Sequence, residues 1–242
     1  MSDPKKEPEE EATVPFGPQR GADSSLGEGH HRRWGNARLL LENDDTGSWV
    51  IKDFSVCHPA IRSTWSQLLL QREYKACNRL DGLEGVPRSC TREGSFSLRY
   101  RFMPGMTLRD AHEKGTQFPA DYFMKLEELV AAMHERRVVH LDLRNARNIL
   151  LQEDGQPALL DFQTALSSRW MLPSIRRLLE NVDRSAVYKH WSRIDPEGMP
   201  PEKADWLQRF ERWRPWWPIE GYALQKWKQR RQERREKSQG SK

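Results

Sequence analysis

The sequence of 242 residues is poor in cysteine and has no long apolar run. Its three cysteines, Cys57, Cys77 and Cys90, form no CxxC pair and leave one without a partner, so we expect reduced structural thiols. There is no stretch of 18 apolar residues and no charged-then-apolar start followed by a cleavage site. These absences argue against a membrane span and against secretion, and they indicate a cytoplasmic protein.

Composition and charge are distributed unevenly along the chain. Apolar residues make up 36% and charged residues 31%, which allows a sizeable core beneath a wide polar surface. Residues 1–30 have almost no apolar periodicity and many Glu, Pro, Gly and Ser, so we expect them to be disordered. Residues 221–242 hold eight Lys and Arg against two Glu, a net +6, whereas the whole chain is +5. The basic character therefore belongs to the C-terminal tail.

An acid, an amide and a second acid stand in an informative order in the second half of the chain. Residues 140–151 read HLDLRNARNILL, and Asp161 follows in Asp-Phe-Gln. Phosphoryl transfer needs a group that orients the acceptor hydroxyl and oxygen ligands for Mg²⁺. Asn148 and Asp161 supply an amide and a carboxylate for the metal, which leaves Asp142 for the acceptor. A hairpin with its turn at residues 153–157 would bring the two ligands to neighbouring strand ends.

At these residues the chain resembles the protein kinase superfamily, with a His-x-Asp catalytic loop, a downstream Asn and an Asp-Phe-Gly-like metal motif. It departs from the pattern at Leu141, where protein kinases usually carry Arg, and at Gln163, which replaces Gly. The resemblance is greatest to the small bacterial lipopolysaccharide core kinases and RIO-like kinases. It implies an α+β, two-lobed protein kinase-like fold with a small antiparallel sheet lobe and a mainly helical lobe.

The catalytic loop is one residue longer than the family pattern between Asp142 and the usual Asn position. Asn145 is therefore a competing metal ligand. Asn148 is preferred, because it directly precedes the Ile-Leu-Leu strand as the family's Asn does. By the same resemblance, we expect His140 to support the backbone of the metal motif through a hydrogen bond and not to act as a base.

The upstream half offers a lysine and a glutamate in the order that kinases use. Residues 37–42 and 48–54 are apolar runs around a turn at residues 43–47, which predicts a hairpin. Lys52 follows two aliphatic residues, like the lysine strand of kinases, and is expected to contact phosphates. A helix predicted over residues 61–80 contains Glu73, the expected ion-pair partner of Lys52.

Nucleotide contacts are less well marked than the metal ligands. There is no GxGxxG motif before residue 37, and Gly35 is the candidate for close backbone approach to a phosphate; a flexible linker glycine is the equal alternative. A strand over residues 97–102 is followed by a Met-Pro-Gly break, which reads as a hinge. By resemblance, backbone groups of Arg101, Phe102 and Met103 would hold the adenine ring.

Helices are expected through the rest of the chain. Thr107 is expected to cap a short helix, and an amphipathic pattern predicts a helix over residues 121–136. Ser174 and Asp183 are expected to cap two successive helices, and aromatic spacing predicts another over residues 206–213. The chain then divides into a disordered segment 1–30, a small lobe 31–103, a helical lobe 104–220 and a basic tail 221–242.

Partners follow partly from composition and partly from the resemblance. Six of the ten tryptophans lie in residues 191–227, next to the basic tail. Tryptophan beside Lys and Arg suits an anionic membrane surface, while nucleic acid is the less favoured partner and capping of the core is the plain alternative. The resemblance favours the inner face of a membrane and implies a nucleotide plus a hydroxyl acceptor, either protein Ser/Thr or a lipid-linked sugar.

Two functional hypotheses come from these residues. The first is an ATP- and Mg²⁺-dependent phosphotransferase in which Asp142 orients the acceptor, Asn148 and Asp161 bind the metal, Lys52 contacts the phosphates and Glu73 positions Lys52. The second is a pseudokinase that serves as a membrane-associated binding module. The missing Gly-rich loop, Gln163 and the lengthened catalytic loop favour the second hypothesis.

Overall fold

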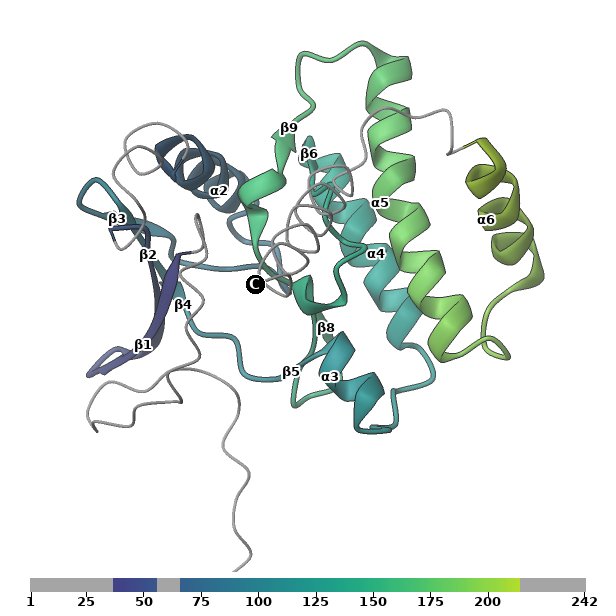
Figure 1. Ribbon diagram of the computed structural model, residues 1–242, viewed down its shortest axis with the longest axis horizontal. Coiled ribbons are helices and arrows are strands. Elements are labelled where there is room, and N and C mark those ends of the chain that lie inside the picture. Colours follow the sequence, from purple (N-terminus) through teal and green to yellow (C-terminus); the bar gives the residue numbers. More distant parts are fainter. Residues whose placement is uncertain (1–36, 56–65, 214–242) are drawn as a thin grey trace, which may run out of the picture.

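The computed structural model describes residues 37–55 and 66–213, which form an α+β protein with small antiparallel sheets and several helices (Figure 1). A four-stranded sheet and helix α2 lie on one side of Figure 1, and helices α4, α5 and α6 lie on the other. This arrangement is compatible with two lobes. Predicted segments 1–30 and 221–242 lie outside the described residues.

The four-stranded sheet has the order β1-β2-β4-β3 and is antiparallel throughout. Its strands are β1 (Arg38–Asp44), β2 (Gly47–Asp53), β3 (Thr91–Glu93) and β4 (Ser97–Arg101). The predicted first hairpin is confirmed, but its turn is only two residues long. The carboxylate of Asp44 accepts hydrogen bonds from the backbone N–H groups of Thr46 (2.8 Å) and Gly47 (3.1 Å). This side-chain contact closes the turn tightly and lets both strands extend toward it.

Helix α2 (Gln67–Arg79) packs against this sheet and carries Glu73 on its buried face. It is shorter than the predicted helix 61–80, whose first residues, 61–65, lie outside the described part. A small apolar cluster of Phe54, Leu70, Leu98 and Tyr100 joins helix and sheet. The same face of β2 therefore directs Lys52 toward α2.

A sharp connection at Gly105 leads from β4 to the helical part. Gly105 has a φ of +146°, and an added Cβ would lie 2.6 Å from the carbonyl oxygen of Leu151, so only glycine fits. Strand β5 (Met106–Thr107) then pairs with β7, and α3 (Leu108–Glu113) begins at Thr107, whose hydroxyl accepts from Asp110 N–H at 3.1 Å. The predicted break and the predicted Thr107 cap are both confirmed.

Two further small sheets frame the central loop. Strands β7 (Ile149–Leu151) and β8 (Pro157–Leu159) form the predicted second hairpin, with Ile149 opposite Leu159. Strand β6 (Val138–Val139) pairs with β9 (Leu166–Ser167). Short 3₁₀ turns, η2 (Ala146–Asn148) and η3 (Phe162–Thr164), join these strands.

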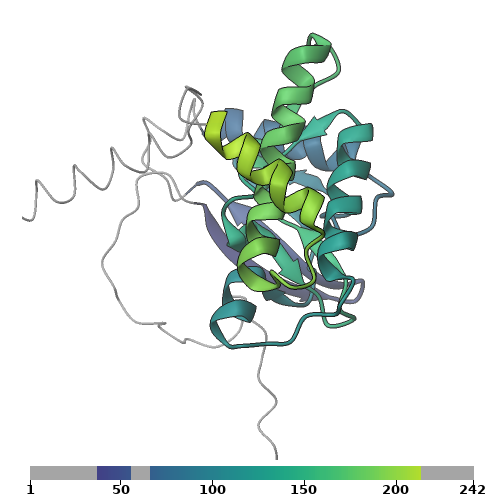
Figure 2. The same ribbon diagram turned by 90° about the vertical axis from the view of Figure 1, so that its right-hand side faces the viewer.

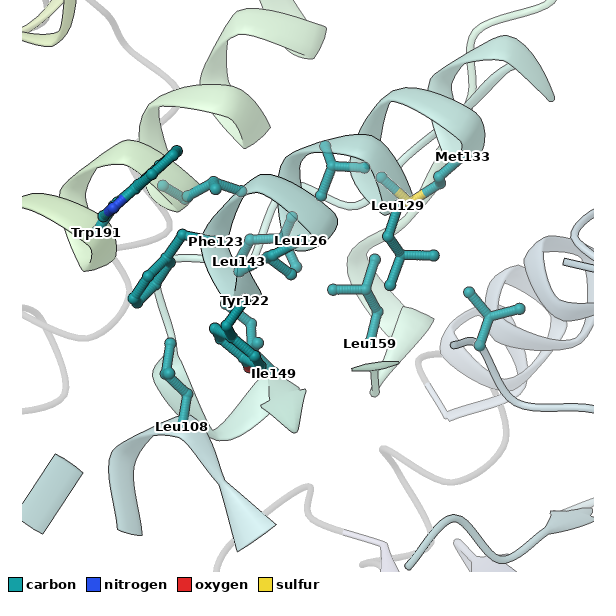
Figure 3. Close-up of a cluster of buried hydrophobic side chains, with 14 of the residues drawn as sticks. Leu108, Tyr122, Phe123, Leu126, Leu129, Met133, Leu143, Ile149, Leu159 and Trp191 are labelled. Carbon is teal, nitrogen blue, oxygen red and sulfur yellow. The ribbon is translucent and has the colours of Figure 1, made fainter. Parts of the chain in front are cut away.

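The main core lies beneath helix α4 (Tyr122–Glu135), whose predicted apolar face is confirmed (Figure 3). The ring of Phe123 stacks on Trp191 of α5 at 5.7 Å between centroids. Residues of α4 that are buried include Phe123, Leu126, Leu129, Val130 and Met133. Helix α6 (Pro201–Trp213) covers α5 and agrees with the aromatic spacing at residues 206–213.

Helix α5 (Pro173–Ile194) corrects the expectation of two successive helices. It runs 22 residues without a break, and Asp183 lies in its interior instead of at a cap. An Asp side chain inside a helix usually competes with the helix by forming hydrogen bonds to nearby backbone groups. The Asp183 carboxylate instead accepts hydrogen bonds from the backbone of residues 140 and 141. The helix therefore continues through it.

Two of the three cysteines lie in the described residues, and the described helices can be compared with the needs of a membrane span. Cys77 is buried, Cys90 is partly buried, and both are free, while Cys57 lies outside the described residues. Among the helices of the described ranges, none has the length and apolar character needed to cross a bilayer.

The burial of Leu126 allows a first prediction. Its side chain is fully buried in the main core, so Leu126→Ala is expected to lower the free energy of unfolding by about 3 kcal/mol. Met124 lies two residues earlier on the same helix but is 45% exposed, so Met124→Ala is the matched control, with an effect below about 0.5 kcal/mol. Urea unfolding measures both. Equal effects would show that this face of α4 is not the core.

Candidate functional site

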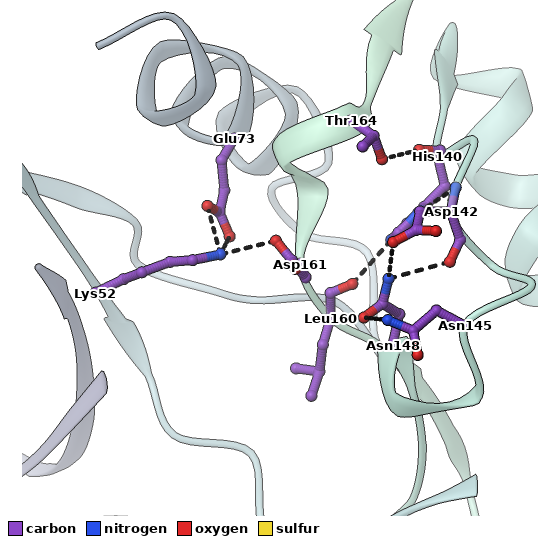
Figure 4. Close-up of polar contacts among 9 residues, drawn as sticks. All are labelled: Lys52, Glu73, His140, Asp142, Asn145, Asn148, Leu160, Asp161 and Thr164. Carbon is purple, nitrogen blue, oxygen red and sulfur yellow. Dashed lines mark hydrogen bonds and ion pairs between the residues drawn. The ribbon is translucent and has the colours of Figure 1, made fainter. Parts of the chain in front are cut away.

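Lys52, Glu73 and Asp161 meet between the four-stranded sheet, α2 and the segment after β8 (Figure 4). The Lys52 Nζ lies 2.9 Å from Glu73 Oε2 and 2.8 Å from Asp161 Oδ1. The Lys52 and Glu73 side chains are buried, whereas that of Asp161 is 41% exposed. The predicted Lys52–Glu73 ion pair is thus present, and Asp161 joins it.

The charges of Lys52, Glu73 and Asp161 shift one another's pKa values. Burial by itself would lower the pKa of Lys52, but the carboxylates of Glu73 and Asp161 outweigh it and raise that pKa. Burial raises the pKa of Glu73, against the opposing effect of Lys52. For Asp161 the burial effect is overcome by the Lys52 charge, which holds the pKa of that carboxyl below 3.8. The site therefore keeps a fixed cation beside an ionised, partly exposed carboxylate.

Asp161 has an unusual backbone that is supported from the catalytic loop. Its φ of +61° and ψ of +71° place it in the left-handed region, which Asp and Asn tolerate better than most residues. The His140 Nε2 donates to the carbonyl oxygen of Leu160 at 2.8 Å, directly before Asp161. The ring of His140 also lies 4.7 Å from that of Phe162, between centroids. The predicted hydrogen bond from His140 to the backbone next to Asp161 is confirmed.

Asp142 and Asn148 face each other across the catalytic loop (Figure 4). The Asn148 amide Nδ2 donates to Asp142 Oδ2 at 2.9 Å and to the Asp142 carbonyl at 3.0 Å. The backbone N–H of Leu160 donates to the Asn148 carbonyl at 2.8 Å, so Asn148 lies beside the residue that precedes Asp161. The hairpin therefore brings the two predicted metal ligands to neighbouring strand ends, as expected.

Asn145 and Asn148 both form hydrogen bonds to Asp142, but they differ in burial. Asn148 is buried, and its Oδ1 accepts from Asn145 Nδ2 at 3.3 Å. Asn145 is exposed and its own Oδ1 accepts from the backbone N–H of Arg147, which caps the 3₁₀ turn. Asn148 keeps its place next to the strand.

The ionisation of Asp142 leads to a second prediction. Burial raises its pKa above 3.8, although Asn148 opposes the shift. A raised pKa favours folding below 3.8, and this contribution is lost as pH rises through the raised value. Asp142→Asn removes the cost of the buried charge and still accepts from Asn148. It is expected to be about 1 kcal/mol more stable than the parent at pH 7. Urea unfolding at several pH values measures the difference, which should shrink toward pH 3.8; a constant difference would contradict it.

Asp183 is a part of the site that the sequence did not assign. Its carboxylate accepts from the backbone N–H groups of His140 and Leu141, both at 2.7 Å, and lies 3.0 Å from His134 Nε2. Leu141 has a φ of +66°, a strained value for this residue. Asp183 therefore holds the bent backbone of residues 140 and 141. The available signal was an acid on the apolar stripe of α5, between Leu179 and Val187 at helical spacing.

The predicted nucleotide contacts are only partly brought to the site. The backbone N–H groups of Arg101 and Phe102 are taken by the carbonyls of Arg88 and Ser48, both at 3.0 Å. The Arg101 guanidinium stacks on Trp49, 4.4 Å from the ring centroid. The backbone N–H groups of Arg101 and Phe102 are thus already hydrogen-bonded within the protein. Met103 stays the candidate whose backbone N–H would contact adenine. Gly35 lies outside the described residues.

The donor set fits a hard divalent cation bound together with a nucleotide. Within the described ranges, no group of three or more His, Cys, Asp and Glu side chains is placed to hold a metal by itself. Asp161 and Asn148 offer carboxylate and amide oxygens, which Mg²⁺ prefers, and Mg²⁺ commonly takes its remaining ligands from phosphates and water. The arrangement fits a metal that arrives with its phosphates.

Comparison with known proteins gives a partial match. No family model matches the chain. Serine/threonine-protein kinase C of Synechocystis sp. (strain ATCC 27184 / PCC 6803 / Kazusa) is 31% identical over 71 residues. The matched part is 28% of this chain and spans only 13% of that protein. The similarity suggests a kinase-like relationship over this part of the chain.

Proposed function

We propose that the chain is an ATP- and Mg²⁺-dependent phosphotransferase of the protein kinase-like superfamily. The observation that carries the proposal is the position of Lys52, whose amine is shared by Glu73 and Asp161 at 2.9 and 2.8 Å. A buried amine held between a helix carboxylate and a strand-end carboxylate is the arrangement that positions nucleotide phosphates in kinases.

The charge balance of the cluster supports the proposal of a bound metal. Lys52 contributes one positive charge, while Glu73, Asp161 and Asp142 contribute up to three negative charges when all are ionised. An anionic triphosphate would be repelled by such a site unless a cation came with it. When bound, Mg²⁺ supplies positive charge against the phosphate oxygens. Asp161 and Asn148 would hold it, and Lys52 would orient the phosphates.

Asp142 is the group that faces the acceptor. Its carboxylate is fixed by Asn148 Nδ2 at 2.9 Å, and its backbone N–H donates to His140 Nδ1 at 3.3 Å. We infer that this fixed carboxylate accepts the proton of the acceptor hydroxyl, with Asn148 and Asn145 holding it in place. Burial raises the pKa of this carboxyl, which strengthens it as a proton acceptor when ionised.

The acceptor that we propose is an alcohol, either a protein Ser/Thr or a lipid-linked sugar. All of these present the same oxygen to Asp142. The partial similarity to a serine/threonine-protein kinase supports the protein acceptor. The test is incubation with γ-labelled ATP and a lysate fractionated into protein, lipid and small-molecule pools. Label should enter one pool with the parent and none with Asp161→Ala; equal labelling by both would contradict the proposal.

The second candidate is a pseudokinase that acts as a membrane-associated binding module. Three features of the sequence favour it: no GxGxxG motif precedes residue 37, Gln163 replaces the usual Gly, and the loop from Asp142 to Asn148 is one residue longer than the family pattern. A thermal shift with millimolar ATP and Mg²⁺ separates the candidates, because ligand that binds the folded state raises the apparent stability. A rise in Tm that requires both components supports the enzyme. No rise favours the binding module.

A further inference from the structure

The largest exposed apolar side chains of the described residues gather at one end of α5. Trp170 is 88% exposed, Leu172 66% and Ile175 47%. All three lie within residues 169–177, which we call the tip. In Figures 1 and 2 the first turns of α5 project beyond the neighbouring helices. Exposed tryptophan and leucine at a projecting point are costly in water, so contact with another surface is expected.

Positive charge surrounds these apolar side chains. The Arg169 guanidinium lies 5.0 Å from the ring centroid of Trp170, and Arg177 is exposed on the first turns of α5. Arg176 is paired with Glu180 at 3.6 Å, the single acid of these turns. The tip thus combines an aromatic ring, two aliphatic side chains and a net positive charge.

A basic groove of about 650 Å³ continues from the tip along α2. Arg72, Lys75 and Arg79 line it, and Trp170 belongs to both the groove and the tip. The Arg79 Nη1 donates to the hydroxyl of Ser167 at 3.0 Å, on the opposite wall. Among the described residues that line the groove, none carries a carboxylate. Its three basic side chains can contact anionic groups, while Ala76, Val138, Ala165 and Leu166 make much of the remaining wall apolar.

We propose that the tip and the adjoining groove form a docking surface for an anionic membrane. Trp170, Leu172 and Ile175 enter the interface, where an amphipathic ring is most favourable, and the basic side chains meet anionic headgroups. This surface does not depend on the proposed phosphotransferase activity. It would place the chain on a membrane through residues of its folded part.

A lipid surface fits the tip better than a protein partner. A stable protein interface covers about 800 Å² per partner and depends on complementary, broad surfaces. The tip instead presents three apolar side chains on a projecting end, with arginines beside them. That shape suits shallow insertion between headgroups, where a few side chains are enough when charge attraction adds to them.

The test is co-sedimentation of the full chain with vesicles of phosphatidylcholine alone or with 30% phosphatidylglycerol. The parent should bind the anionic vesicles and lose binding at high salt. The double variant Trp170→Ser with Ile175→Gln should bind at least tenfold more weakly. Arg72→Gln with Lys75→Gln should lose roughly fivefold per charge. Met124→Gln, at an apolar site equally exposed as Ile175, and Lys114→Gln are the matched controls and should bind like the parent.

Three results would overturn the proposal. The first is sedimentation of the parent that is no better with anionic than with neutral vesicles. The second is binding by the tip variant, folded by circular dichroism, that is as tight as the parent's, which would assign binding to residues outside the tip. The third is a loss of binding by Met124→Gln as large as that of the tip variant, which would show a general effect of surface hydrophobicity.

Discussion

Replacing Asp161 by asparagine is expected to abolish phosphoryl transfer while leaving the fold intact. The change removes the ionised oxygen that we propose as a metal ligand, and a loss of at least about 10³-fold in rate is expected. Asn tolerates the left-handed backbone at this position, and Lys52 keeps Glu73 as its partner. The free energy of unfolding should therefore stay within about 1 kcal/mol of the parent. Initial rates with γ-labelled ATP measure the first effect, and urea unfolding the second.

Asp154→Asn is the matched control for this variant. Asp154 lies in the turn of the β7–β8 hairpin, where it accepts from the backbone N–H of Gln156 at 3.0 Å, and an amide oxygen makes the same contact. This variant should keep the parent's rate. Transfer by Asp161→Asn at more than about a tenth of the parent's rate would show that Asp161 does not bind the metal.

Replacing Asp183 by alanine is expected to be the most destabilising change in the site. It leaves the buried N–H groups of His140 and Leu141 without their acceptors, and each such group costs about 1–3 kcal/mol. The positive φ of Leu141 also loses its support. A loss of about 4 kcal/mol in the free energy of unfolding is expected, measured by urea unfolding, together with loss of activity.

Two comparisons separate this effect from a general one. Asp183→Asn keeps one acceptor oxygen, so it should lose roughly half as much stability as the alanine variant. Asp205→Ala, at an exposed acid on α6, should change the free energy of unfolding by less than about 0.5 kcal/mol. Equal stability of Asp183→Ala and the parent would mean that Asp183 does not hold the catalytic loop.

Much of the site follows from local pattern. Local pattern placed Lys52 on a strand and Glu73 on the next helix, and the resemblance to protein kinases implied that the two side chains pair. The β7–β8 hairpin was also readable from local pattern, since its turn residues lie between two apolar runs. The buried face of α4 follows from its 3.6-residue period.

Other features depend on contacts that local pattern does not contain. Asp183 meets Leu141 and His140 from 42 and 43 residues away, and an Asp near apolar residues reads equally well as a helix cap. The hydrogen bond of the Phe102 N–H group depends on the register between β4 and β2. The alternation of polar and apolar residues in the sequence does not by itself fix that register. Sequence reasoning thus anticipated the Lys52–Glu73 pair but missed the contact of Asp183 with residues 140 and 141.

The role of Asp142 in phosphoryl transfer from ATP is tested most directly by the rate of transfer from γ-labelled ATP, in Mg²⁺, to the pool that the parent labels. This rate is compared between the parent and Asp142→Asn. We expect the variant to be at least about 10²-fold slower although it still binds ATP and Mg²⁺ and is as stable as the parent or more so. Full transfer by Asp142→Asn would show that Asp142 does not serve the transfer.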